Sequence, residues 1–172
     1  MPSRSPPWKP SSIKYTRPPN PSPNLQTVFA FIDACNEWTK TRSVERTMVL
    51  FDDTLEHRIL PNSLARPVLN KKQYAEYTGG LLQRIKSYKI SLHGVVESGD
   101  TIVIHTTSVG EGFNGTSFSG EEMTTFRFVP PAEQGGLPRI CSVKEFVDSR
   151  STYQFFLEER RKSEERAGGN PS

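Results

Sequence analysis

The stretch YKISLHGVVESGDTIVIHTTSVG, residues 88–110, decides the fold class of this chain of 172 residues. It holds two runs in which apolar and polar side chains alternate, and the turn sequence ESGD separates them. This pattern predicts two antiparallel strands joined by a short loop. The runs EEMTTFRFV (residues 121–129) and RICSVKEFVDS (residues 139–149) have the same character. The second half of the chain is therefore predicted to form a mostly antiparallel sheet.

Helical periodicity dominates the first half of the chain. Ser22 and Pro23 form an N-cap and first-turn signal, and apolar residues then recur at helical spacing from Val28 to Trp38. Another helix follows Asn70, which has a capping glutamine three residues later, and a last helix is predicted over residues 150–165. Helices followed by a run of strands predict an α+β fold with the helices on one face of a curved sheet.

The predicted domain spans residues 24–165. Residues 1–23 hold eight of the fourteen prolines, interspersed with serine and basic residues. Such a segment buries too little apolar surface to repay the entropy of ordering, so a disordered tail is expected there. Residues 166–172 are expected to form a second disordered tail.

The charge distribution argues against a nucleic-acid partner. The formal net charge is +3, but Arg4, Lys9, Lys14 and Arg17 all precede the first acidic residue, Asp33. Without that segment (+3 minus +4) the charge is about −1, which provides no basic field for binding phosphate groups.

The chain has no apolar run as long as the roughly 18 to 20 residues of a membrane span, and its start lacks the apolar core of a signal peptide. We therefore expect a cytoplasmic protein with no membrane contact. Cys35 on a helical face and Cys141 in a strand are typical of buried thiols rather than of a disulfide or a metal site. No nucleotide-binding motif is present, and no cofactor or metal is expected.

Two turns allow the strands to be aligned. A three-residue loop at residues 97–99 would pair Val96 with Asp100 and would place His93 opposite Val103. His105 would then lie on the same face as His93, one diagonal step away. A two-residue loop at Ser98-Gly99 is the alternative, and it would separate the two histidines.

The second turn, Asn114-Gly115, is the strongest hairpin signal in the chain and would place Thr124 opposite His105. One face of the sheet then resembles a pocket wall, and it carries the following residues: His93, Val95, Val103, His105, Thr107, Glu122, Thr124, Phe126 and Phe128. A bulge at Gly110 or Gly112 would instead turn Glu122 to the opposite face.

The last predicted strand carries a carboxylate among apolar residues. Glu145 shares a face with Val143 and Val147, so it is expected to point into the interior. Since buried carboxylates are costly unless they are paired or functional, two interpretations remain open. Glu145 is either a catalytic group or the partner of a basic residue such as Arg127 or Arg58.

Three segments resemble the SnoaL-like polyketide cyclase domains of the nuclear transport factor 2-like superfamily, in particular its uncharacterised fungal members. They are LFDDTLEHRILP (residues 50–61), SLARPVLNKKQYAEYTGGL (residues 63–81) and VKEFVDS (residues 143–149), and the resemblance covers about residues 24–160. It implies a cone in which a strongly bent sheet wraps around helices and encloses an apolar cavity. It also implies a homodimer formed through the sheet.

The ketosteroid isomerase branch of that superfamily has a cavity-lining F-x-F strand, which Phe126 and Phe128 match. The oxyanion-hole acid of that branch would fall at Thr124, however, and its base would fall near Arg58. Both departures argue against that specific mechanism.

The resemblance and the strand faces together lead to one hypothesis, which is acid–base catalysis without a cofactor on a small hydrophobic molecule. His105 would transfer the proton, Glu122 or Glu145 would orient it or act as the complementary acid, and His93 would donate to a developing enolate oxygen. The walls suit a polyketide or terpenoid substrate undergoing isomerisation, dehydration or ring closure. The expected pocket residues are Trp38, Tyr77, Val103, Thr124, Phe126 and Phe128.

Two alternatives remain open from sequence. The face with the histidines could be convex, so that they lie in solvent or at a dimer interface and the chain is a non-catalytic ligand-binding or interaction domain. His93, His105 and Glu122 could also form a metal site with two histidines and one carboxylate, although their diagonal spacing makes three converging ligands doubtful.

Overall fold

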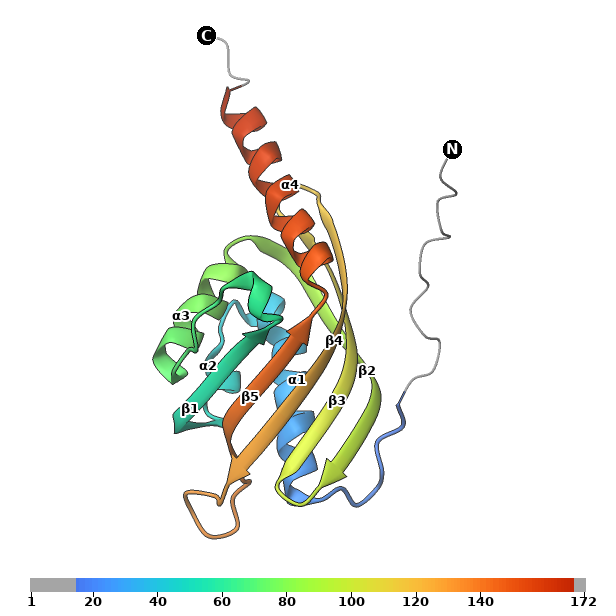
Figure 1. The fold of residues 1–172 in the computed structure, drawn as a ribbon, viewed down its shortest axis with the longest axis vertical. Coiled ribbons are helices and arrows are strands. Elements are labelled where there is room, and N and C mark those ends of the chain that lie inside the picture. The colour runs from blue at the N-terminus through green and yellow to red at the C-terminus, as the bar shows by residue number, and fades with distance from the viewer. Residues whose placement is uncertain (1–14, 169–172) are drawn as a thin grey trace.

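The computed structural model describes residues 15–168. It contains one five-stranded sheet, four α-helices and a short 3-10 helix (Figure 1). The elements are α1 (Pro23–Thr41), α2 (Glu45–Met48), β1 (Phe51–Leu60), η1 (Asn62–Leu64), α3 (Lys71–Leu82), β2 (Ile85–Ser98), β3 (Thr101–Gly112), β4 (Ser117–Val129), β5 (Arg139–Val147) and α4 (Ser149–Gly168).

The sheet has the strand order β1-β5-β4-β3-β2. Strands β2 to β5 form an antiparallel meander, and β1 pairs with β5 in parallel at one edge. The sheet is twisted and curved, with α1 against one of its faces and α3 beside β1 (Figure 1). The prediction of an α+β fold with a mostly antiparallel, curved sheet is confirmed.

The main core lies between α1 and the concave face of the sheet. Val28 and Ile32 of α1 pack against Ile102, Phe126 and other fully buried side chains of the central strands. Apolar residues at helical spacing on α1 thus contact apolar residues at alternate positions of the strands. These two patterns give the helix and the sheet one buried face each.

The predicted helix caps are present. The Ser22 hydroxyl oxygen accepts a hydrogen bond from the Leu25 N–H at 3.1 Å, with Pro23 in the first turn. At the start of α3, the Asn70 side chain accepts from the Gln73 N–H at 2.9 Å, and the Gln73 side chain accepts from the Asn70 N–H at 3.0 Å. Each cap satisfies backbone donors that have no partner inside the helix.

The predicted N-terminal tail, residues 1–23, falls in part outside the described residues, which begin at Tyr15. Residues 15–22 lie against the domain. The Tyr15 N–H donates to the Leu92 carbonyl at 3.1 Å. The Arg17 guanidinium forms a bidentate ion pair with the Asp33 carboxylate, with N–O distances of 2.6 and 2.8 Å. At the other end, α4 runs to Gly168 and the predicted tail beyond it lies outside the described residues.

Both hairpin loops differ in length from the prediction. The loop between β2 and β3 has two residues, since Ser98 pairs with Thr101 and Gly99 has φ +59°. The loop between β3 and β4 has three residues rather than two, because the Gly112 N–H donates to the Thr116 carbonyl and Gly115 has φ +76°. In each loop a glycine takes the left-handed conformation, which both loop lengths require.

The longer second loop shifts β4 by one position relative to β3. His105 therefore lies opposite Met123 instead of Thr124. A one-residue shift exchanges the two faces of a strand. The predicted face was therefore right for β4 and wrong for β3, where Ile102 and Ile104 face the core and His105 faces outward.

Candidate active site

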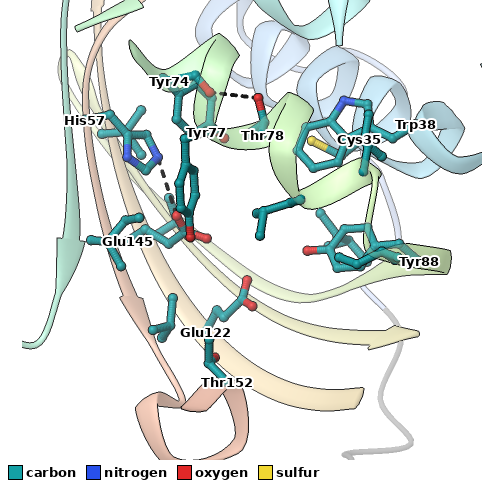
Figure 2. Close-up of a pocket in the computed structure, with 18 of the residues that line it drawn as sticks. Cys35, Trp38, His57, Tyr74, Tyr77, Thr78, Tyr88, Glu122, Glu145 and Thr152 are labelled. Carbon is teal, nitrogen blue, oxygen red and sulfur yellow. Dashed lines mark hydrogen bonds and ion pairs between the residues drawn. The ribbon is translucent and has the colours of Figure 1, made fainter. Parts of the chain in front are cut away.

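A cavity of about 610 Å³ lies between the concave face of the sheet and helices α1, α3 and α4 (Figure 2). Its walls are mainly apolar and aromatic, and its rim includes exposed residues of the η1–α3 segment and of the first turns of α4. The aromatic residues of the wall include Phe31, Trp38, Tyr77, Tyr88, Phe118 and Phe156.

Three ionisable side chains from three strands point into this cavity (Figure 2). His57 comes from β1, Glu122 from β4 and Glu145 from β5. Each lies at an alternate position of its strand among buried neighbours; on β1, for example, the alternating buried residues are Leu55, His57 and Ile59. The period of two along each strand thus carries these polar groups to the same face as the core.

Neighbouring groups fix both the backbone and the imidazole ring of His57. Its backbone N–H donates to the Leu69 carbonyl and its carbonyl accepts from the Leu69 N–H, both at 2.9 Å, while β5 pairs along the other edge of the strand. The imidazole stacks on Tyr74 with ring centroids 4.1 Å apart and planes 22° apart. Burial of the ring lowers the pKa of His57 from 6.5 to about 4. The ring is therefore neutral at physiological pH.

Glu145 lies beside His57, with 3.4 Å between Glu145 Oε2 and His57 Nε2. Removal from bulk water, with a further contribution from the neighbouring Glu122 charge, raises the pKa of Glu145 from 4.5 to about 8. About 27% of its side chain remains accessible, against 2% for His57. Glu145 therefore reaches the cavity as a carboxylic acid that still holds its proton at neutral pH.

Glu122 occupies a different environment a short distance away. Its partner in the β4–β5 pairing is Val147, while Glu145 pairs with Thr124, so the two carboxyl groups are diagonal neighbours on one face. Glu122 Oε1 accepts a hydrogen bond from the Ser108 hydroxyl at 2.7 Å. Burial raises the pKa of Glu122, and the hydrogen bond from Ser108 opposes that rise. The two carboxyl groups therefore differ in their neighbours: Glu122 has a hydroxyl donor, and Glu145 has the His57 imidazole.

An aromatic wall closes the other side of the cavity. Trp38 and Tyr88 stack with centroids 6.0 Å apart and planes 17° apart. The Trp38 Nε1–H donates to the Thr47 hydroxyl at 2.7 Å, so the indole has a buried polar partner while its ring stays in the wall. Burial also raises the pKa of the Tyr88 hydroxyl well above its usual value, which keeps it a neutral hydrogen-bonding group.

Five of the residues predicted for the site lie in this cavity: Trp38, Tyr77, Glu122, Thr124 and Glu145. Three others do not line it. Phe126 is fully buried in the core between α1 and the sheet, and Phe128 is half-buried and packs against that core. Val103 lies opposite Thr125 on the outer face of the sheet.

His93 and His105, which were predicted in the pocket, lie on the outer face of the sheet. The first reason is the one-residue shift of β4 described above, and the second is a bulge in β2 between Leu92 and Gly94 that turns His93 outward. There His105 Nε2 lies 2.6 Å from Glu121 Oε1, and His93 Nε2 lies 2.6 Å from the Thr107 hydroxyl. Their assignment to the cavity wall was wrong.

The basic residues considered as partners of Glu145 are engaged elsewhere. Arg127 donates to Asp100 at 3.0 Å, and Arg58 lies 3.8 Å from Glu56. The partner of Glu145 is His57, a residue that was not among those predicted for the site. The alternation of Leu55, His57 and Ile59 was the available signal, because it marks His57 as facing inward.

Within residues 15–168, no three histidine, cysteine, aspartate or glutamate side chains cluster closely enough to hold a metal ion. In the same range, no helix combines the length and the apolar character of a membrane span.

No protein-family model matches the chain. A search of curated proteins found a relative named monooxygenase AacuO from Aspergillus aculeatus, which is 23% identical over 136 residues, 78% of this chain and 79% of that protein. At this identity the relative's name does not transfer to the chain.

Solved structures give a clearer result. The BvnE pinacolase from Penicillium brevicompactum has a TM-score of 0.67 at 22% identity, with 82% of this chain and 96% of that chain covered. PrhC from Penicillium brasilianum has a TM-score of 0.68 at 12% identity, covering 83% and 93%. A protein from Jannaschia sp. CCS1, named as a putative SnoaL-like polyketide cyclase, has a TM-score of 0.60 at 14% identity, covering 82% and 96%. The chain therefore shares its fold with these proteins, one of which is described as SnoaL-like, and the fold that the sequence indicated is confirmed.

Proposed function

We propose that this protein binds a small hydrophobic, ring-containing molecule and catalyses its isomerisation, dehydration or ring closure by acid–base catalysis. The acid is Glu145 and the base is Glu122, and both are supplied by the chain itself. The observation that carries the proposal is the placement of these two carboxyl groups in different surroundings on one wall of a single cavity.

The surroundings assign the two roles. An acid must hold its proton at working pH and a base must be ionised, and pairs of carboxyl groups achieve this when their environments separate their pKa values. Glu145 has the neutral His57 as its neighbour and a pKa of about 8, so it keeps its proton. Burial raises the pKa of Glu122, but the hydrogen bond from Ser108 opposes that rise, and the Glu122 charge itself raises the pKa of Glu145, so we assign the base to Glu122.

These roles give a balanced proton transfer. For a ring ketone, Glu145 donates its proton to the carbonyl oxygen while Glu122 removes a proton from the adjacent carbon, which forms the enol. The enol then returns its O–H proton to Glu145 while Glu122 delivers its proton to a different carbon, which gives the isomer and restores both groups. For an alcohol, the proton from Glu145 lets the hydroxyl leave as water while Glu122 takes the proton that completes the double bond. In dehydration Glu145 ends as a carboxylate and Glu122 as a carboxylic acid, and proton exchange with water restores both groups.

The substrate class is inferred from the cavity. Its volume of about 610 Å³ is within the range of roughly 300 to 1,000 Å³ that is typical of small-molecule sites. Its aromatic walls suit a rigid ring system of the polyketide or terpenoid kind. Proteins of similar fold include the BvnE pinacolase and TerC, whose crystals contain polyporic acid.

The enolisation of 1-tetralone, an uncharged bicyclic ketone, tests this proposal without knowledge of the natural substrate. The protein is incubated with 1-tetralone in deuterated buffer, and loss of the proton signal next to the carbonyl is followed by NMR. Glu122→Gln and Glu145→Gln should each slow the exchange by about 100-fold or more relative to the unaltered chain. His105→Ala is the matched control, because that residue lies outside the cavity and should leave exchange unchanged.

Exchange no faster than in buffer, with the ketone bound, would contradict the catalytic proposal. The alternative, a non-catalytic ligand-binding or interaction domain, would then be favoured. Equal exchange by the two glutamine variants and the unaltered chain would show that the acid and the base lie elsewhere.

We also propose that the outer face of the sheet forms a homodimer. Large apolar side chains on that face are exposed, with accessible fractions of 67% for Val96, 47% for Met123 and 54% for Phe146. Such a patch on one sheet face is typical of an interface. The mass of the protein in solution at micromolar concentration should be that of a dimer, and Met123→Lys should reduce it to that of a monomer. A monomeric mass for the unaltered chain would exclude the dimer.

A further inference from the structure

We infer that His57 is a positioning residue for the acid. Its neutral imidazole donates the Nε2–H to Oε2 of Glu145, so that the carboxyl proton resides on Oε1. The catalytic meaning of this arrangement rests on the proposed function above, while the arrangement itself can be tested separately.

Among residues 15–168, the Glu145 carboxyl is the one polar side-chain group found in contact with the imidazole ring. Its Nε2 lies 3.4 Å from Glu145 Oε2, whereas Nδ1 is buried without a hydrogen-bond partner. The ring cannot turn to exchange these positions freely, because one of its faces is stacked on Tyr74 and the strand backbone is paired on both edges. The protein therefore fixes which nitrogen meets the carboxyl group.

The unpartnered Nδ1 decides the position of the proton. If the ring were charged, or if it were neutral with its proton on Nδ1, an N–H donor would be buried with no acceptor. Buried N–H groups without a partner are rarer in proteins than buried acceptors without a donor. Only the neutral form with the proton on Nε2 avoids this cost, because it leaves a lone pair alone on Nδ1.

The tautomer in turn orients the carboxyl group of Glu145. When Oε2 accepts the Nε2–H, the carboxylic proton is placed on the other oxygen. Within the described part of the chain, His57 is the one polar group recorded in contact with the Glu145 carboxyl. The accessible part of this side chain belongs to the cavity wall. Oε1–H is thus directed at a bound molecule.

His57 itself is too enclosed to exchange a proton with that molecule. Only about 2% of its side chain is accessible, and Nδ1 has no access to the cavity. It acts on the substrate through Glu145, as a hydrogen-bonding neighbour of an acid, and it is not the base.

Other ionisable groups face the carboxyl group of Glu145 and set the conditions of the test. They are Glu122 from β4, Tyr88 from β2, Tyr74 and Tyr77 from α3 and Cys35 from α1, each close enough to Glu145 to interact with it electrostatically. Burial raises the pKa of the tyrosines and of Cys35, so these groups stay neutral over the range in which Glu145 titrates.

The first measurement uses the unaltered protein. Nitrogen-15 NMR of the histidine rings reports the tautomer, and the His57 signal is assigned by its loss in His57→Gln. The inference predicts a neutral ring at pH 7 with the proton on Nε2. A proton on Nδ1, or a charged ring at that pH, would overturn it.

The second measurement determines whether the pKa of Glu145 rises or falls when His57 is replaced. The side-chain carboxyl of Glu145 is titrated by carbon-13 NMR and assigned by its loss in Glu145→Gln. A donor at Nε2 stabilises the carboxylate, so His57→Phe should raise the pKa of Glu145 and His57→Gln, which keeps an N–H donor, should raise it less. If Nε2 instead accepted the carboxylic proton, His57→Phe would lower that pKa, and the inference would fail.

Exchange of 1-tetralone separates this inference from the proposed function. If both NMR results are as predicted but Glu145→Gln does not slow exchange, His57 still positions the carboxyl group and the proposed reaction is wrong. If Glu145→Gln abolishes exchange but the His57 proton is on Nδ1, the reaction stands and the positioning role is wrong. When both hold, His57→Phe should lower kcat with little change in KM.

Discussion

His57 and Glu145 meet diagonally across the parallel pair of β1 and β5. In that pairing His57 lies opposite Val143 and Glu145 lies opposite Ile59, yet Nε2 and Oε2 come within 3.4 Å. Because β1 is an edge strand joined to β5 in parallel, residues from the two ends of the domain share one wall of the cavity. The contact therefore exists only when β1 and β5 have paired.

The buried acid should make stability depend on pH. The folded pKa of Glu145, about 8, lies above its ordinary value of 4.5. The unfolded chain therefore releases this proton first, and the stability that Glu145 contributes below about pH 4.5 is lost as the pH rises towards about 8. Between about pH 7 and about pH 9 the free energy of unfolding should fall by roughly 1 kcal/mol more in the unaltered chain than in Glu145→Gln.

Chemical denaturation of both proteins across that range checks this dependence. His57 does not disturb the comparison, because its lowered pKa affects stability only in acid, between about 6.5 and about 4. Parallel pH dependences of the two proteins would show that Glu145 ionises normally.

Gly112 should be intolerant of a side chain. A Cβ atom there would lie 2.2 Å from the Glu159 carboxyl carbon, and that carboxyl accepts from the Thr116 N–H and the Asn114 N–H. These contacts hold α4 against the loop between β3 and β4. Gly112→Ala should therefore destabilise the protein by about 1 to 3 kcal/mol in chemical denaturation, since buried hydrogen bonds must be given up.

Gly79→Ala is the matched control for that substitution. Gly79 lies in the interior of α3, and nothing lies within 4 Å of the position that its Cβ would take. Alanine favours the helix by about 0.5 to 1 kcal/mol over glycine, so this variant should be more stable than the unaltered chain. Loss of stability would mean that the helix needs the glycine there.

The hydrogen bond from Trp38 to Thr47 should contribute measurably to the free energy of unfolding. Trp38→Phe and Thr47→Val each remove one partner, and each should lower the free energy of unfolding by about 1 to 3 kcal/mol. The loss of stability in the double variant should be smaller, by about 1 kcal/mol, than the sum of the losses in the two single variants. Strict additivity would indicate that the bond contributes nothing.

His105 should be dispensable for binding in the cavity. It lies on the outer face of the sheet beside Glu121, and a partly exposed ion pair contributes only about 0 to 1 kcal/mol. Calorimetric titration with 1-tetralone should give the same affinity for His105→Ala and the unaltered chain, whereas Thr124→Leu, inside the cavity, should change it. A lost affinity in His105→Ala would mean that the outer face takes part in binding.

The elements and the fold class could be predicted from sequence because they depend on local patterns. Apolar residues at helical spacing predicted α1, and the cap formed by Asn70 and Gln73 predicted α3. The alternation of apolar and polar residues predicted the strands. Glu122 was placed correctly because alternation along β4 ties it to the buried Phe126.

The register could not be predicted in the same way. The lengths of the two hairpin loops differ from the expected ones by a single residue, and Gly94 permits a bulge beside His93 without showing by itself that one forms. Such small differences change which side chains share a face, so the histidines of β2 and β3 were misplaced. The pairing of His57 with Glu145 depends on a parallel contact between distant strands, which no local pattern records.

The pH dependence of 1-tetralone exchange tests the acid and base assignment most directly. We expect kcat/KM to fall above about pH 8, as Glu145 loses its proton, and to fall also in acid, as Glu122 gains one. Residual exchange should lose the alkaline fall in Glu145→Gln and the acid fall in Glu122→Gln. A profile that keeps both falls in both variants would contradict the claim that these two carboxyl groups are the acid and the base.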